Sequence, residues 1–500
     1  YEDVLGITAA ISVVGGAAAV TVPARSTVIF SYLPNPLTPA IQTDTRCSMP
    51  LPNQSGLPPS GQIVIDGENI RADFAGKLRA TQINPTGFGD AGPGAGGSEI
   101  DQLLAANDGS SLLVGLTGNL EQNQNALLLF IDSGVAVDSV LTATAGPGVV
   151  SAIRGSRMDD GFTPAWLLVI NAVPSNVWYA DLVNLAENTS EFLGAGEVNG
   201  PASTLAGGAQ IAFNNTNTGG VTGATVLNAN TANTGFEIRL PFDLIKLRTG
   251  SVKLLAAVAG PSGYFSNQSL PGMGLMLPGC VGGYQNLGNG PVDFGKVAGT
   301  QYSTVALQNI AYQQFGSNAP VRMLPAGSPV SISGQVGTGA FAEPRSFYMQ
   351  DAANYSGIRV LLPSGTLAQL GQAVSVTGFT GVEQGEPVIY ATGVVLGGAA
   401  PVPEAVGVRN RDLGGGATNG FTGVEGGVGL ANVGINARIW GCVTSTGTDS
   451  SGNAFFYLDD GSGASDGAAV GVRVYTSFTL PPAGAYAMAK GVSSVEELSL

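Results

Sequence analysis

One pattern of residues occurs twice in the last third of the chain, and it constrains the fold more than any other feature. The first copy reads FYMQD and then GIRV, and the second reads FYLDD and then GVRV. Each copy predicts two short strands joined by an acidic turn. Gly334 and Gly441, which precede the two copies, suit a kink in a strongly coiled first strand. The pattern predicts two small five-stranded, OB-like barrels in tandem, at residues 325–400 and 401–500.

The two copies differ at their ends. The first continues into EPVIYATGVV, which predicts a fifth strand, whereas GVSSVEEL in the second is followed only by Ser499 and Leu500. A barrel that lacks a strand exposes unpaired backbone groups beside an apolar interior, which is costly. We therefore expect either a longer natural chain or a strand that arrives from elsewhere.

The first 60 residues contain a suitable strand. Ile7, Ala9, Ile11 and Val13 alternate with small or polar residues, and a proline-rich connector follows. Residues 1–60 are thus predicted to form an extended β arm. Two interpretations of this arm are open. It inserts into the second barrel of another subunit, which is β-augmentation, or it pairs within its own sandwich.

Residues 61–315 contain apolar runs such as SLLVGLTGNL, ALLLFIDSG and AWLLVINAV, separated by loops rich in glycine and asparagine. Such runs fit strands deep in a two-sheet sandwich. SEIDQLLAAN is the best candidate for a short helix. Because 75 glycines and 29 prolines are scattered between short strands, we predict an all-β chain. Its parts are the extended arm, a large jelly-roll-like β-sandwich and the two barrels.

The charge balance argues against nucleic acid as a partner. The formal net charge is −15, and the chain has only 20 lysine and arginine residues. Nucleic-acid binding depends mainly on such residues, which neutralise phosphates. The longest apolar stretch, AAISVVGGAAAV, is too short to span a bilayer and is broken by Gly-Gly, so no membrane span is expected.

The chain contains no histidine, which excludes a Ser-His-Asp triad and any His-ligated metal. The stretch GPGAGG fits G-x-G-x-x-G but follows no strand of a βαβ unit, so we do not interpret it as a nucleotide site. Carboxylate pairs such as Asp159 and Asp160 would suit a glycosidase. Nothing in the sequence places two of them across a cleft, and we expect no enzymatic activity.

Acids near predicted strand ends suggest a calcium site. Ca²⁺ binds carboxylate and carbonyl oxygens, and the candidate ligands in the sandwich are Glu99, Asp101, Asp132 and Asp138. The chain has no D-x-D-x-D-G loop, and no other cofactor is expected. The acidic stretch LDDGSGASDG in the second barrel is interpreted as a solvated turn.

The three tryptophans suggest different roles. Trp166 and Trp178 are the candidates for stacking on a glycan, although their places within predicted strands favour core packing. Trp440 matches Ser333 of the first repeat, and the strand alternation turns it away from the barrel interior. We therefore expect Trp440 to contact another domain or subunit.

The three cysteines are too few for a disulfide framework. If the protein is exported, Cys47 and Cys280, which flank the sandwich, are expected to form a bridge and leave Cys442 over. The alternative is that all three are buried small side chains.

Several stretches resemble a group of exported bacterial sandwich proteins. They include ATQINPTGFGD, LTGNLEQNQNALLLFIDSG, TGFEIRLPF and YFSNQSLPG, spread over residues 62–310. The group is distantly similar to the DOMON domains and the family-9 carbohydrate-binding modules. The repeats resemble the OB-like modules that follow such domains in exported proteins. The resemblance implies an extracellular or cell-surface location and this architecture, and it implies no catalytic activity.

Two hypotheses of function follow. In the first, the chain is a structural protein that self-associates into a filament, sheath or layer at the cell surface, because it has few lysines to prevent edge-to-edge strand pairing. In the second, it is an adhesin that binds surface polysaccharide through the sandwich, with the barrels as spacers.

Overall fold

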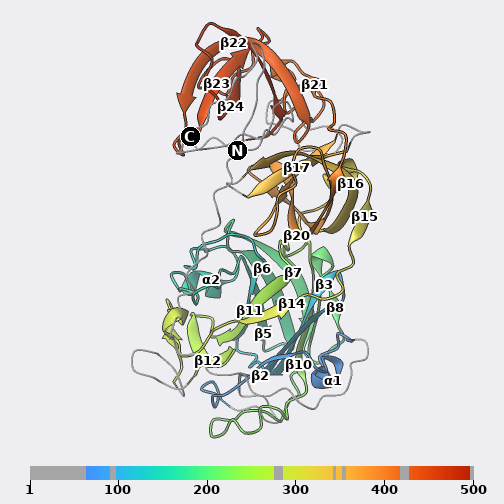
Figure 1. Ribbon diagram of the computed structural model, residues 1–500. Coiled ribbons are helices and arrows are strands. Elements are labelled where there is room, and N and C mark those ends of the chain that lie inside the picture. Colours follow the sequence, from blue (N-terminus) through green and yellow to red (C-terminus); the bar gives the residue numbers. More distant parts are fainter. Residues whose placement is uncertain are drawn as a thin grey trace, which may run out of the picture. The chain divides into compact units, whose positions relative to one another are not determined.

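The computed structural model describes residues 63–89, 97–274, 285–341, 345–351, 356–416 and 427–495. In these residues the chain is all-β, as predicted, with mostly antiparallel sheets and only short helices. It divides into two compact units between Ala311 and Tyr312. The first unit contains a six-stranded and an eight-stranded sheet, and the second contains a six-stranded and a five-stranded sheet (Figure 1).

One sheet of the first unit has six strands in the order β1-β2-β3-β10-β9-β8. The bounds are β1 Leu78–Thr81, β2 Glu99–Asn107, β3 Ser111–Asn119, β8 Ser203–Thr204, β9 Gln210–Phe213 and β10 Gly235–Pro241, with the short helix η1 at Ala206–Gly208. The helix expected in SEIDQLLAAN is wrong, because this stretch forms β2. A strand that is buried on both faces loses its alternation, and the spacing of Ile100, Leu103 and Leu104 then imitates a helix.

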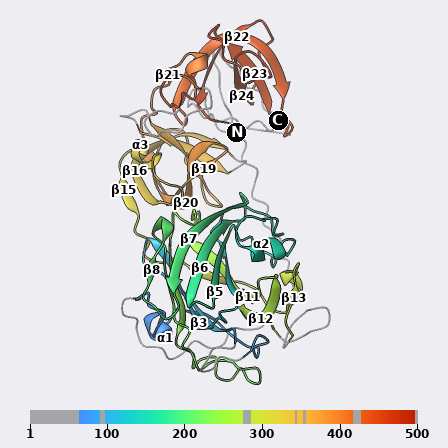
Figure 2. The same ribbon diagram turned by 180° about the vertical axis from the view of Figure 1, so that it is seen from behind.

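The other sheet follows the order β13-β12-β11-β4-β5-β6-β7, and β14 pairs with β11. Figure 2 shows β5, β6 and β7 side by side. The bounds are β4 Ala126–Asp132, β5 Trp166–Val173, β6 Val177–Asn184, β7 Thr189–Glu197, β11 Ser251–Ala259, β12 Tyr264–Leu270, β13 Gly288–Asn289 and β14 Ser303–Ala306.

Both faces of this sheet are buried at its centre. On β4, Leu127 and Leu129 face one side, and Leu128 and Phe130 face the other, where they pack in a cluster that includes Phe294. This cluster is completed by α2 (Gly148–Ala152) and η2 (Phe294–Lys296). The apolar runs that predicted deep strands therefore reflect burial on two sides.

Residues 63–77 cover the outer face of the six-stranded sheet. They contain α1 (Ile70–Asp73), and Ile70 and Phe74 form an apolar cluster with Leu104 and Leu113. Gly115 of β3 permits this close approach, because a Cβ atom there would lie 2.7 Å from Ile70 Cγ2. The glycine at position 115 therefore allows residues 63–77 to pack against β3 at this place.

The first sheet of the second unit closes into a barrel. The bounds are β15 Gln313–Phe315, α3 Asn318–Val321, β16 Pro329–Phe341, β17 Ser346–Gln350, β18 Gly357–Leu361, β19 Gln372–Glu383 and β20 Glu386–Ala399. β20 lies between β18 and β19, and β19 pairs back onto β16. Ile332, Phe347, Val360 and Ile389 lie in its core.

The second sheet repeats this order up to β25. The bounds are β21 Val406–Gly407, η3 Asn410–Asp412, β22 Asn436–Thr448, β23 Ala454–Asp459, β24 Val472–Tyr475 and β25 Tyr486–Val492. The acids of the two repeated turns have matching partners. Asp351 accepts the backbone N–H of Asn318, and Asp460 accepts that of Asn410. Each acidic turn therefore fixes the short helix that precedes its barrel.

Candidate functional site

Among the residues that the structure describes, the second barrel differs from the first by a gap between β24 and β25, where no described strand lies. In the first barrel, Ile389 of β20 is paired with Val360 of β18 in parallel and with Thr380 of β19 in antiparallel register. Among the described strands of the second barrel, β24 pairs with β23 and β25 pairs with β22, and none lies between β24 and β25. The fifth strand expected to be missing has no counterpart in the described residues.

The apolar interior is correspondingly less covered beside this gap. Val360 on β18 is 0% exposed, and the neighbouring Ile358 is also buried. Their counterparts in the second copy, Val474 and Val472, are only half-buried. A strand placed in the gap would therefore remove apolar surface from water as well as pair backbone groups.

The polar contacts beside the gap show a second difference. In the first barrel, Tyr348 donates to Glu386 Oε2 at 2.9 Å, and Arg359 Nη1 lies 3.7 Å from the same oxygen. Glu386 is the first residue of β20. The repeated tyrosine and arginine are thus joined by an acid that the fifth strand supplies.

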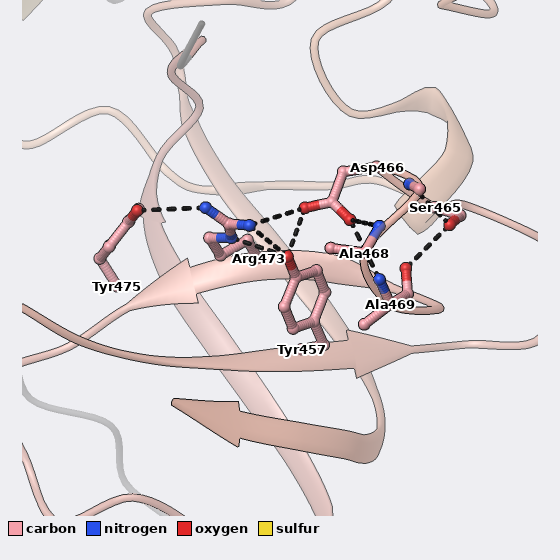
Figure 3. Close-up of polar contacts among 8 residues, drawn as sticks. Tyr457, Ser465, Asp466, Ala468, Ala469, Arg473 and Tyr475 are labelled. Atoms are coloured by element: carbon pink, nitrogen blue, oxygen red, sulfur yellow. Dashed lines mark hydrogen bonds and ion pairs between the residues drawn. The ribbon is translucent and has the colours of Figure 1, made fainter. Parts of the chain in front are cut away.

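In the second barrel, a loop supplies the acid (Figure 3). Arg473 Nη2 lies 3.1 Å from Asp466 Oδ2, Arg473 Nε donates to the Tyr457 hydroxyl at 2.8 Å, and Tyr457 donates to Asp466. The backbone N–H groups of Ala468 and Ala469 hold the other Asp466 oxygen. The stretch interpreted as a solvated turn therefore contains an acid with defined partners.

These contacts set opposite pKa shifts in the two barrels. Burial raises the pKa of Glu386 to about 7, although the Tyr348 hydrogen bond and the Arg359 charge oppose this. Burial also acts to raise the pKa of Asp466, but the Tyr457 and backbone hydrogen bonds and the Arg473 charge outweigh it and lower the pKa. Asp466 is therefore ionised at neutral pH and neutralises Arg473.

The outer face of β22 and β25 carries exposed apolar side chains. Trp440 is 49% exposed and lies opposite Met488, and Tyr486, which is 88% exposed, lies opposite Cys442. Ile439, next to Trp440, belongs to the core. Trp440 thus points away from the interior, beside the strand that borders the gap.

Cys442 is unbridged in the described part of the chain. The expected Cys47–Cys280 bridge lies outside the described residues, as do the residues of the arm.

The four acids predicted to bind calcium lie in different places. Glu99 and Asp101 are fully buried at the start of β2, where the Asn217 side chain donates to Glu99 and the Val221 N–H donates to Asp101 at 2.6 Å. Burial raises the pKa of Asp101 to about 8.

The other two acids do not join them. Asp132 ends β4 in the other sheet, where its Oδ2 lies 3.5 Å from Lys253 Nζ. Asp138 is exposed in the segment that follows. The structure therefore brings together one pair of the predicted ligands, on β2.

The structure gathers three other acids that sequence reasoning missed. Asp66, Asp73 and Glu237 each offer a carboxylate oxygen within 4.8 Å of the other two. Glu237 lies more than 160 residues after Asp66 and Asp73 in the chain, so spacing could not reveal the group. The available signal was Glu237 itself, a lone acid within the apolar strand TGFEIRLPF.

Trp166 and Trp178 are buried, with Trp178 entirely so. The Trp178 indole N–H donates to the Glu197 carbonyl, and Lys246 Nζ lies 5.7 Å from the centre of the Trp166 ring. Neither ring offers an open face to a sugar, and no observation in the described residues favours the adhesin hypothesis.

No helix among the described residues combines the length and apolar character needed to cross a membrane. Comparison of the chain with protein-family models, with curated proteins and with solved structures found no match.

Proposed function

We propose that this chain is a non-enzymatic structural protein of the cell exterior that self-associates into a filament, sheath or layer. The observation that carries the proposal is that no strand among the described residues lies between β24 and β25, whereas the other copy of the barrel is closed by β20 at this place. Because both edges of the gap are strands and its floor is apolar, its best occupant is another strand. The extracellular location rests on the resemblance of residues 62–310 to exported proteins.

The proposed occupant is residues 7–13 of another copy. In the first barrel, Ile389 and Ala391 of β20 project toward the core from alternate positions. Ile7, Ala9 and Ile11 have the same spacing. A strand in the gap would run parallel to β24 and antiparallel to β25, as β20 does with β18 and β19. Donation from each copy to the next gives open-ended growth when the symmetry does not close.

The exposed side chains of Trp440 and Tyr486 favour this face of the second barrel as a contact surface between copies of the chain. They lie on β22 and β25, and β25 borders the gap. Aromatic side chains are enriched at protein interfaces. The arm of the donating copy can therefore bind in the gap while the rest of that copy contacts the exposed aromatic side chains.

Deletion of residues 1–22 tests the proposal. We expect the intact chain to form elongated assemblies by electron microscopy and the deletion variant to remain a folded monomer by light scattering and circular dichroism. Ile11→Lys should also prevent assembly, because it places a charge on the apolar face of the arm. Ser12→Lys, on the opposite face, is the matched control and should assemble.

Two results would refute the proposal at different levels. Assemblies that survive the deletion would show that the arm is not the donor. An intact chain that stays a monodisperse monomer at high concentration would rule out self-association itself.

A further inference from the structure

The cluster of Asp66, Asp73 and Glu237 lies between the six-stranded sheet and the segment that covers it. Glu237 projects from β10, directly opposite Gly115 of β3, which is the residue that lets α1 approach the sheet. Asp66 precedes α1, and Asp73 is its last residue. Two polypeptide segments distant in sequence thus contribute carboxylates to one place.

The Glu237 side chain is buried in this cluster and held there by backbone hydrogen bonds. Its side chain is 0% exposed, and its Oε2 accepts the backbone N–H groups of Asp66 at 2.8 Å and of Gly67 at 2.7 Å. Its Oε1 has no hydrogen-bond partner in the structure described. Since buried carboxylate oxygens are normally satisfied, this oxygen points to a ligand.

The charges around Glu237 point to a cation. Asp66, Asp73 and Glu237 bring three carboxylate oxygens within 4.8 Å of one another, and ionised carboxylates at such distances repel each other. A cation between the carboxylates would replace this repulsion with attraction.

We propose that Asp66, Asp73 and Glu237 bind one Ca²⁺ ion, with Glu237 Oε1 as the buried ligand. The donors are all carboxylate oxygens, which suit hard cations, and the chain has no histidine to offer a softer metal. Ca²⁺ accepts irregular sets of oxygens, whereas Mg²⁺ demands a near-octahedral set and keeps its waters. The ion would fasten residues 63–77 onto β10.

The neighbouring backbone supports this role as a fastening point. Gly67 has a φ of 78°, and a Cβ atom there would lie 2.8 Å from the Asn214 nitrogen. The Gly67 carbonyl accepts the N–H of Gly235, the first residue of β10. The segment is therefore held closely at the place where the ion would bind, and losing the ion should loosen it.

Calcium titration of the metal-free full-length protein tests the assignment. Isothermal titration calorimetry should find Ca²⁺ binding that Glu237→Gln removes, because this change keeps the side-chain shape and removes the charge. Asp73→Asn, at a less buried position, should weaken the affinity at least about tenfold and serves if Glu237→Gln does not fold. Glu191→Gln, at an exposed acid on β7 of the same unit, is the control and should bind as the wild type does.

Thermal unfolding gives the second readout. Ca²⁺ at a concentration that just saturates the wild type should raise the melting temperature of the wild type and of Glu191→Gln by about 5 °C, and it should raise that of Asp73→Asn by clearly less. No Ca²⁺ binding at millimolar concentration, or wild-type affinity in both cluster variants, would overturn the proposal. An equal response to Mg²⁺ would overturn the assignment to Ca²⁺. The assay uses no assembly readout, so its outcome is independent of self-association.

Discussion

The two repeats offer a matched pair of substitutions that measures how open the second barrel is. Val360 and Val474 occupy the same place in GIRV and GVRV. Val360 is fully buried and pairs with Ile389 of β20, whereas Val474 is half-buried beside the gap. The same change, valine to alanine, can therefore be made once with a covering strand and once without it.

The expected decrease in the local free energy of opening follows from how deeply each valine is buried. Val360→Ala removes two buried methyl groups, worth roughly 0.8 kcal/mol each, and leaves a cavity. We expect it to lower the local free energy of opening by about 2–3 kcal/mol. For Val474→Ala, half-burial and the absence of a closed cavity reduce this to about 1 kcal/mol. In the assembled protein, a strand in the gap should raise the cost at Val474 toward the value at Val360.

Native-state hydrogen exchange with mass spectrometry measures the decrease in local opening free energy for both substitutions in the full-length chain, through peptides that contain β18 and β24. The residues 1–22 deletion variant provides the unassembled state. Equal costs at the two positions in that variant would refute the reasoning, because the gap would then already be covered. A cost at Val474 that does not change on assembly would show that nothing enters the gap.

Three further changes probe other contacts. Gly115→Ala places a Cβ atom 2.7 Å from Ile70 Cγ2 and should destabilise the first unit by about 1–3 kcal/mol, so an unchanged melting temperature would contradict the packing. Burial raises the pKa of Asp101 to about 8, so the folded state holds an extra proton between about pH 4 and about pH 8. Thermal stability should fall as pH rises through that window, and Asp101→Asn should flatten the slope. The pKa of Asp466 is lowered, so its contribution is present above about pH 4 and lost in stronger acid. Asp466→Asn should therefore speed hydrogen exchange in β24 at neutral pH, and this effect should diminish as the pH falls below about 4.

The all-β class could be predicted because its signals are local. Alternation, turn residues and a repeated pattern are properties of short stretches, and the copies around Tyr348 and Tyr457 align without reference to anything distant.

Other features depend on which strands become neighbours, and the sequence does not contain that information in a local form. Glu237 meets Asp66 only because β10 pairs with β3 and residues 63–77 fold over both. The four acids predicted to bind calcium were chosen by their proximity to strand ends. Proximity to a strand end selected Glu99 and Asp101, which are buried neighbours on β2. It could not show that Asp132 belongs to the other sheet.

The source of the acid beside each arginine bears on how selective the proposed strand exchange would be. In the first barrel, Glu386 belongs to the fifth strand, so that strand must carry an acid at a fixed position to match Arg359. In the second, Asp466 has already neutralised Arg473 from within the same domain. An incoming strand then needs only alternating apolar side chains, a requirement that many unrelated sequences meet. Subunits with divergent arms could therefore be interchangeable, and mixed polymers could form from related chains without any change in the receiving barrel.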